Sequence, residues 1–394
     1  MPARIVLVSL ALGNLWSTIA LAAPWARHTI DASSRGADGV RIADVNGDGL
    51  MDLATGWEEG GVIRAYLNPG PKTSKQPWPA VTVGNVKSPE DAVFADIDGD
   101  GAMDVVSSCE GKTRNIFIHW APNAPANYLK GDAWQTEKIP CADNNQMWMF
   151  CLPMQVDWRH GIDLVVSSKG PNASVGWLEA PANPHDLAAW KYHRLYDAGW
   201  IMSLIARDMD RDGDQDVLVS DRKGPNRGVL WLENPGNENA SDDRPWNTRR
   251  LGASDREVMF LAVGNKGSDY HNSVFATCRG NGIAMLSPPE WSLTDIPMPA
   301  NCGTGKGIAI TDVNLDGNSD VIFTCESANG SKSGVRWLSR DEADIWKDHE
   351  ISGPDGIKFD RIEMLDLDQD GDLDLVTCEE RANLGVIWYE NPTR

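Results

Sequence analysis

The chain has 394 residues, of which 41% are hydrophobic and 24% are charged, and its 57 acidic and 36 basic side chains give a formal net charge of −21. This composition is typical of globular proteins and excludes intrinsic disorder. The acidic excess argues against a nucleic-acid-binding protein, because phosphate contacts require a basic surface. Tryptophan is unusually frequent, with 17 Trp against 7 Phe and 6 Tyr, which favours Trp at a repeated structural position.

Residues 1–22 have the pattern of a secretory signal peptide. Arg4 supplies a positive charge, residues 5–22 are mostly apolar, and residues 20–22 offer a small-x-small cleavage site. No later segment is long and apolar enough to span a bilayer. We therefore expect a secreted or periplasmic protein with no membrane insertion, whose mature chain begins near Ala23.

One acidic motif recurs along the chain and divides it into seven repeats. Each intact copy reads D-x-[DN]-x-D-G-x-x-D, with a short strand of alternating residues before it and another after it. A shortened copy spans residues 157–163 and a degenerate copy spans residues 265–272. The five intact copies span residues 44–52, 96–104, 208–216, 312–320 and 366–374.

Tryptophan marks two further strands in each repeat. In several repeats a third strand carries Trp, as at Trp177 and Trp388, and a fourth strand opens with Trp at positions 25, 78, 134, 190, 246, 291 and 346. Seven repeats of four short strands predict an all-β fold, a seven-bladed β-propeller that forms a single domain over residues 23–394.

The two ends of the chain predict how the ring closes. The first of the fourth-strand tryptophans, Trp25, precedes every acidic motif, whereas the last repeat stops after three strands. We therefore expect the strand at residues 25–30 to complete the last blade, so that no blade keeps an unpaired edge. An open solenoid with frayed ends is the alternative.

The acidic motif is typical of a calcium loop. Oxygen ligands at the first, third and fifth positions converge, and the following Gly permits a sharp turn. Unlike a helix–loop–helix site, the loop lies between two strands and takes its last Asp at the ninth position. Five Ca2+ ions would offset ten negative charges, a large part of the acidic excess. We predict about five structural sites, with the ligands Asp44, Asn46, Asp48, Asp52, Asp96, Asp98, Asp100, Asp104, Asp208, Asp210, Asp212, Asp216, Asp312, Asn314, Asp316, Asp320, Asp366, Asp368, Asp370 and Asp374.

With these motifs, residues 24–394 resemble the FG-GAP or VCBS repeat proteins, integrin-α-like seven-bladed propellers related to the integrin head and to some fungal lectins. The resemblance implies calcium in the loops that join the first and second strands of the blades. It does not imply one function, because the family includes adhesins, lectins and polysaccharide lyases.

The face opposite the acidic loops is the expected ligand face. Its loops mix acids, bases, Ser and Trp with frequent Gly, which favours a polar ligand with several hydrogen-bonding edges, and an extracellular carbohydrate fits best. Lys169, Arg222, Lys223 and Arg227 lie on adjacent repeats and could hold a sulfate or a carboxylate. We expect a monomer that binds no nucleic acid. The candidate ligand-binding residues are Glu58, Asp91, Glu110, Lys112, Lys169, Asp221, Arg222, Lys223, Arg256, Glu257, Arg279, Lys306, Arg361 and Glu379.

Two other functions stay open. The first is a polysaccharide lyase or sugar dehydratase at the channel mouth, whose base would usually be His, Tyr or Lys. No His falls in the loops of this face, and the candidate catalytic residues are Lys306, Glu257 and Tyr196. The second is a protein–protein adhesion scaffold, which needs exposed aromatic anchors. Its candidate anchors are Trp148, Phe150 and Trp200.

The seven cysteines are an odd number, so at least one thiol has no intrachain partner. Four of them fall at the end of a second strand, where a small buried residue fits. They are Cys109, Cys278, Cys325 and Cys378. The candidate disulfides are Cys141 with Cys151 and Cys278 with Cys302.

Overall fold

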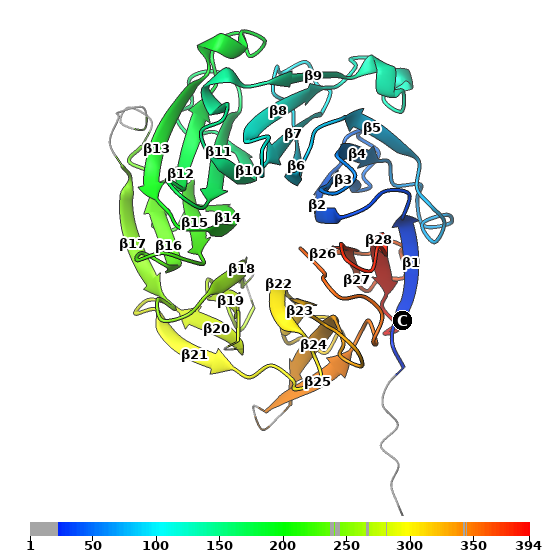
Figure 1. Cartoon of the computed structure of the whole chain (residues 1–394). Helices are drawn as coiled ribbons and strands as arrows, with labels where there is room; N and C mark the ends of the chain where they lie inside the picture. The colour runs from blue at the N-terminus through cyan, green and yellow to red at the C-terminus, as the bar shows by residue number, and fades with distance from the viewer. Residues whose placement is uncertain are drawn as a thin grey trace, which may run out of the picture.

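The computed structural model describes residues 23–236, 240, 245–264, 268–280, 282–341, 343 and 345–394. These residues form seven four-stranded antiparallel sheets, and Figure 1 shows them arranged as blades in a ring around a common centre. The predicted all-β seven-bladed propeller is confirmed. The expected signal peptide lies outside the described residues, as does part of the degenerate motif at 265–272. Among the described residues, no helix has the length and apolar composition needed to cross a membrane.

Six blades are consecutive in sequence, and each runs from an inner strand at the channel to an outer strand at the rim. Blades 1 to 3 consist of β2 (Ala37–Ala43), β3 (Asp52–Trp57), β4 (Val62–Tyr66) and β5 (Ala80–Gly84); β6 (Pro89–Ala95), β7 (Asp104–Cys109), β8 (Asn115–Trp120) and β9 (Gln135–Lys138); and β10 (Met147–Met154), β11 (Asp163–Lys169), β12 (Ser174–Glu179) and β13 (Lys191–Asp197). Blades 4 to 6 consist of β14 (Ile201–Arg207), β15 (Asp216–Asp221), β16 (Gly228–Glu233) and β17 (Asn247–Gly252); β18 (Val258–Val263), β19 (Val274–Cys278), β20 (Gly282–Ser287) and β21 (Ser292–Ile296); and β22 (Thr304–Thr311), β23 (Asp320–Glu326), β24 (Val335–Arg340) and β25 (Trp346–Glu350).

Blade 7 joins the two ends of the described chain. Its inner three strands are β26 (Glu363–Leu365), β27 (Asp374–Glu379) and β28 (Gly385–Glu390), and its outer strand is β1 (Ala26–Asp31). β1 pairs antiparallel with β28, and Figure 1 shows the first strand lying beside the last blade. The predicted ring closure is therefore confirmed, and it leaves no exposed edge on β28.

The frequent tryptophans and three of the histidines pack together between the third and fourth strands. Trp177 lies opposite His193 in the paired strands, with 4.7 Å between the ring centres. The equivalent rings of Trp388 and His28 lie 4.4 Å apart. Blade 6 repeats this pair with Trp337 and His349. These histidines are therefore part of the blade packing and lie away from the channel.

All seven cysteines lie in the described part of the chain, and all are free thiols, so the two candidate disulfides are not formed. Cys141 lies in a 3-10 turn, whereas Cys151 lies in the inner strand of the next blade. The thiol of Cys278 donates to a carbonyl of its own strand, and that of Cys302 donates to the carbonyl of Pro299. The thiols at the second-strand ends are buried, as the packing interpretation expects.

Candidate ligand site at the channel mouth

In each blade, the start of the inner strand and the end of the second strand lie at the same end of the hairpin. In blade 1, Asp38 pairs with Gly56 at one end, and Ala43 pairs with Asp52 at the other. The acidic loop joins the two strands at this second end. The inner-strand starts therefore lie at the channel mouth opposite the acidic loops.

Seven equivalent charged residues, one from each blade, form a ring at this mouth. Where the acidic motif ends in Asp, the ring residue follows that Asp by six positions, as Glu58 follows Asp52. Arg279 takes the matching place in blade 5. All seven line one cavity of about 400 Å³. In blade order, this charged ring consists of Glu58, Glu110, Lys169, Arg222, Arg279, Glu326 and Glu380.

The order of charges divides the mouth into two halves. Blades 6, 7, 1 and 2 contribute carboxylates to the charged ring, and blades 3, 4 and 5 contribute cations. Opposite charges meet where the halves join. Lys169 pairs with Glu110 at one junction, and the Nε atom of Arg279 lies 3.3 Å from Glu326 at the other. We call the two sides the acidic half and the basic half.

A bulge near the start of the inner strands supplies the deeper wall of the cavity. The strand register shifts there in six blades. A bulge re-aims side chains that would otherwise alternate between the faces of the sheet. The residues inside the shifts of five blades line the cavity: Glu90, Met149, Phe150, Met202, Met259, Phe260 and Lys306.

The deeper wall differs between the two halves. Beneath the cations of the basic half it is apolar and consists of Met149, Phe150, Met202, Met259 and Phe260, which we call the apolar floor. In the acidic half it is charged and consists of Asp38, Glu90, Lys306 and Asp360. The lining of the cavity is therefore apolar in one part and charged in the other, and the side chains of the apolar floor are 1–6% exposed.

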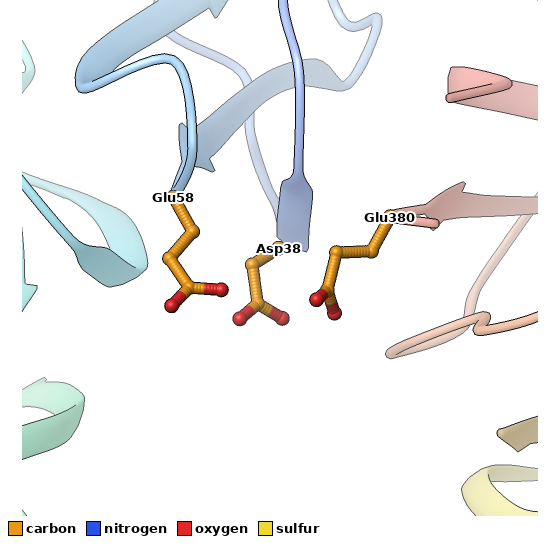
Figure 2. A group of neighbouring side chains, drawn as sticks. All are labelled: Asp38, Glu58 and Glu380. Atoms are coloured by element: carbon orange, nitrogen blue, oxygen red, sulfur yellow. The ribbon is translucent and has the colours of Figure 1, made fainter. Parts of the chain in front are cut away.

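Carboxylates converge in the acidic half. Figure 2 shows Asp38 between Glu58 and Glu380, with the three side chains pointing into the channel, and their oxygens approach within 4.8 Å of one another. Glu58 also lies in a second such group with Glu90 and Glu110. Burial and the neighbouring carboxylates raise the pKa of Glu58, and burial raises the pKa of Glu90 to about 8 despite the nearby Lys169. Such oxygens can accept hydrogen bonds from ligand hydroxyl groups.

Three lysines compensate part of this negative charge. Lys169 Nζ lies 3.2 Å from Glu90 Oε1, and Lys358 pairs with Glu380. Lys306 is buried, bonds to Asp360 and lies 4.0 Å from Asp38 Oδ1. Burial and the Asp360 carboxylate raise the pKa of Asp38 well above its usual range.

The pKa of Asp360 shifts in the opposite direction, although Lys306 acts on both carboxyl groups in the same sense. Its ammonium group outweighs the effect of burial and lowers the pKa of Asp360. The cluster therefore shifts the pKa values of Asp38 and Asp360 in opposite directions.

The basic half is arranged around Trp200. Lys169 Nζ, Arg222 Cζ and Lys223 Nζ lie 4.9, 4.5 and 4.7 Å from the centre of its ring. Arg222 is buried, and its Nε donates to Glu257 Oε2 at 2.8 Å. The buried indole N–H of Trp200 has no acceptor among the described residues. Three cations thus surround one aromatic ring at the cavity wall.

Six of the fourteen predicted ligand-binding residues line the cavity: Glu58, Glu110, Lys169, Arg222, Arg279 and Lys306. Three carboxylates among the others are buried structural acceptors. Asp91 accepts two hydrogen bonds from Arg41, Asp221 accepts from backbone N–H groups that include that of Trp200, and Glu379 accepts from the turn that follows it. Their hydrogen bonds hold the loops and the channel wall.

The remaining five predicted residues lie around the cavity without lining it. Glu257 holds Arg222, and Lys223 lies over Trp200. Arg256 is buried between Asp255 and Asp295, Arg361 lies 3.1 Å from Glu363, and Lys112 is exposed. Arg227, the fourth member of the predicted anion cluster, donates to the carbonyl of Ser254.

The three candidate catalytic residues are not brought together. Lys306 lies in the cavity, whereas Glu257 lies outside its lining. Tyr196 belongs to the outer strand β13, where its hydroxyl donates to Asp221 and to the carbonyl of Asn226. Two of the candidate adhesion anchors, Trp148 and Phe150, are buried, so they do not form an exposed aromatic surface.

Several cavity residues are missing from the predicted set, and the repeat spacing contains the signal for some of them. Counting six positions after the motif selects Glu326 and Glu380, whereas the predicted set names Glu379, which falls one position short. No comparable signal marks the bulges. The other cavity residues outside the predicted ligand-binding set are Asp38, Glu90, Trp200, Lys358, Asp360 and the apolar floor, of which Trp200 and Phe150 were predicted only as adhesion anchors.

The acidic loops bring their oxygens together on the other face. Carboxylates converge in three of the five intact loops: Asp96 with Asp98 and Asp100, Asp208 with Asp210 and Asp216, and Asp366 with Asp368 and Asp374. Within these groups, the buried Oδ1 atoms of Asp96, Asp366 and Asp368 have no hydrogen-bond donor among the described residues. A set of oxygen donors with unsatisfied acceptors fits Ca2+.

The ninth residue of the motif has a second role. Asp52 accepts from the backbone N–H groups of Val45 and Asn68, and so connects the acidic loop to the end of the third strand. Asp163 makes the same two contacts, with Val156 and Ala180, although its motif keeps only Asp157 of the other acidic ligand positions. This backbone contact explains why the ninth Asp is present in an eroded repeat.

Comparison with known proteins defines the class. A model of the FG-GAP-like repeat matches residues 44–107. Together with the seven four-stranded blades, this match supports a β-propeller of the FG-GAP repeat type. No curated protein sequence matches the chain.

Two solved structures with a TM-score above 0.5 share the fold at low sequence identity. The crystal structure of BBS1N in complex with ARL6DN, soaked with lead, contains a chain with a TM-score of 0.55 and 11% identity, over 93% of this chain and 99% of that one. The mercury-soaked crystal of the same complex gives a TM-score of 0.51 and 12% identity, over 92% and 97% of the two chains. A putative gluconolactonase gives 0.43 and 13% identity, over 80% and 92%. At these identities the likeness concerns the fold alone.

Proposed function

We propose that this chain is an exported calcium-binding β-propeller that recognises a carbohydrate in the cavity at the channel mouth. The observation that carries the proposal is the charged ring, which has an acidic and a basic half above an apolar floor. Carboxylates such as Glu58 and Asp38 are suited to accept hydrogen bonds from sugar hydroxyls. The apolar floor is suited to the C–H face of a sugar ring. The cavity volume of about 400 Å³ is within the range of small-molecule sites.

Calcium has a structural role in this proposal. Its ligands would come from the acidic loops on the face opposite the cavity, and the unsatisfied oxygens of Asp96, Asp366 and Asp368 support this assignment. Bound Ca2+ would stabilise the blades without contacting the carbohydrate.

The test is a binding screen with the purified mature protein in the presence of calcium. Titration calorimetry against neutral, uronate-containing and sulfated oligosaccharides should identify at least one that binds. Glu58→Gln should weaken this binding, whereas Lys112→Gln, a change at an exposed loop residue outside the cavity, should not. If no carbohydrate binds, or if both variants bind like the unmodified protein, the proposal is wrong.

A second candidate, an eliminating enzyme, is favoured by one observation. Asp38 and Asp360 lie beside Lys306 in the cavity, and their pKa values are shifted in opposite directions, as in sites that pair a proton donor with a proton acceptor. The same oligosaccharides can be followed by ultraviolet absorbance from new carbon–carbon double bonds. A rise that Asp38→Asn abolishes would establish the enzyme, and no rise would leave carbohydrate binding alone.

A further inference from the structure

We infer that the carbohydrate is acidic, and that one carboxylate or sulfate group of its sugar binds the basic half of the cavity at Arg222, Arg279 and Trp200. This inference rests on the proposed function and adds to it the charge of the ligand and its orientation in the cavity.

The first evidence is the grouping of like charges. Lys169, Arg222 and Lys223 all lie within 5 Å of the ring centre of Trp200, and Arg279 lines the same half of the cavity. Bringing cations together in a partly buried place is unfavourable unless an anion compensates for it. Glu90 and Glu110 compensate Lys169, Glu326 lies beside Arg279, and Glu257 contacts both Arg222 and Arg279. No carboxylate other than Glu257 pairs with Arg222 among the described residues.

The second evidence is the set of donors left without acceptors. Of the nitrogens of Arg222, only Nε has a hydrogen-bond acceptor among the described residues, so its two terminal nitrogens are available to a ligand. These nitrogens belong to a planar fork that matches the oxygens of a carboxylate or a sulfate. The buried indole N–H of Trp200 likewise has no acceptor in the described chain. A buried donor without an acceptor is rare in folded proteins.

The acidic half of the cavity limits the number of anionic groups that the ligand can carry. Glu58, Asp38 and Glu380 converge there, and a second anion beside them would meet direct repulsion. A ligand with one anionic group and several hydroxyls fits both halves. Its charged group would lie at Arg222, its apolar face over Met202 and the rest of the apolar floor, and its hydroxyls at the carboxylates.

The experiment compares matched ligands that differ only in charge. The probes carry one anionic group each: methyl galacturonoside and its neutral methyl ester, methyl glucuronoside and its carboxyl-reduced form, and galactose 6-sulfate and galactose. Calorimetry with the full protein and calcium should give at least tenfold tighter binding for the acidic member of one pair. Whether that pair carries a carboxylate or a sulfate identifies the anionic group.

Variants of the basic half show where the anionic group of the ligand binds. Arg222→Met should weaken binding of the acidic ligand about tenfold to a hundredfold and leave the weaker binding of its neutral partner unchanged. Trp200→Phe keeps an aromatic ring but removes the indole N–H. It should weaken the binding of the acidic ligand alone. Lys112→Met removes a cation outside the cavity and should change neither ligand. Melting curves confirm that each variant is folded.

Two results distinguish a failure of the charge inference from a failure of the proposed function. If neutral members bind as tightly as acidic ones, or if Arg222→Met weakens both alike, the charge inference is wrong and carbohydrate binding stands. If no member of any pair binds, both the inference and the proposed function are wrong.

Discussion

Glu58 and Arg222 occupy the same position in blades 1 and 4, six residues after the last Asp of their motifs, and they line one cavity from opposite halves. Their backbones are placed by the same repeat, yet one side chain is an anion and the other a cation. The repeated architecture therefore supplies seven equivalent positions, and the side chains at these positions make the channel mouth asymmetric. Such asymmetry allows a cavity on a pseudo-symmetric ring to orient a ligand.

The ion pair of Lys306 and Asp360 is expected to stabilise the fold, because both groups are buried. Lys306→Met leaves a buried carboxylate without its main partner and should lower the free energy of unfolding by about 3–5 kcal/mol. Urea denaturation measures this change. Lys112→Met, at an exposed residue, is the control and should stay within about 0.5 kcal/mol. Equal stability of Lys306→Met and the unmodified protein would contradict the assigned pair.

Closure of the ring by β1 is expected to contribute to the stability of the whole propeller. Ile30 is 1% exposed and packs between the last and first blades, so Ile30→Ala should cost about 2–5 kcal/mol. Arg27 lies on the same strand, and its pair with Asp355 is largely exposed, so Arg27→Ala should cost about 1 kcal/mol or less. Chemical denaturation of both variants tests the difference. Equal costs would show that β1 is not packed as described.

The two roles of the acidic motif can be separated by calcium removal. A chelator should lower the melting temperature of the unmodified protein, since a ligand held at a hundred times its Kd contributes about 2.7 kcal/mol per site. Asp366→Ala removes a ligand oxygen from the first position of the motif. It should make the shift in melting temperature smaller and reduce the amount of bound calcium found by elemental analysis. Asp163→Ala removes only the backbone contacts and should lower stability equally with and without calcium. An unchanged melting curve in excess chelator would contradict the calcium assignment.

The buried His119 should make the free energy of unfolding depend on pH. It is buried, its ring nitrogens contact Ser107 and Thr136, and burial lowers its pKa to about 3. Because the folded pKa lies below the unfolded value of about 6.5, His119 favours the folded state fully above pH 6.5 and loses this contribution as the pH falls toward 3.

The loss can be measured against His119→Gln, which has no titrating group at this position. Between about pH 7 and about pH 5, the free energy of unfolding of the unmodified protein should fall by about 2 kcal/mol more than that of the variant. Urea denaturation at several pH values gives the difference. A difference that does not change with pH would show that the pKa of His119 is the same in the folded and unfolded protein.

The repeat was readable from the sequence because its signals are local. The acidic motif, the strands around it and the fourth-strand Trp recur at fixed spacing, so the blade number and the closing strand at residues 25–30 followed directly. The charges at the ring positions were also recognisable in part. Glu58, Glu110 and Arg222 were found because they follow a second strand.

The rest of the site depends on contacts between blades and on local irregularities. From the sequence, Asp91 is expected to be an exposed carboxylate. In the structure it is buried, because Arg41 of the preceding blade lies against it. Met202 and Phe260 read as ordinary apolar strand residues, and bulges turn them to the cavity. No regular alternation of side chains predicts such an extra residue.

The most direct test of the proposed site is a crystal structure of the protein with the tightest acidic oligosaccharide from the binding screen. We predict one sugar in the cavity opposite the acidic loops, with its anionic group at Arg222 and its hydroxyls at Glu58 and Asp38. A sugar bound on the acidic-loop face or on the outer rim, with the cavity empty, would contradict the assignment of the site.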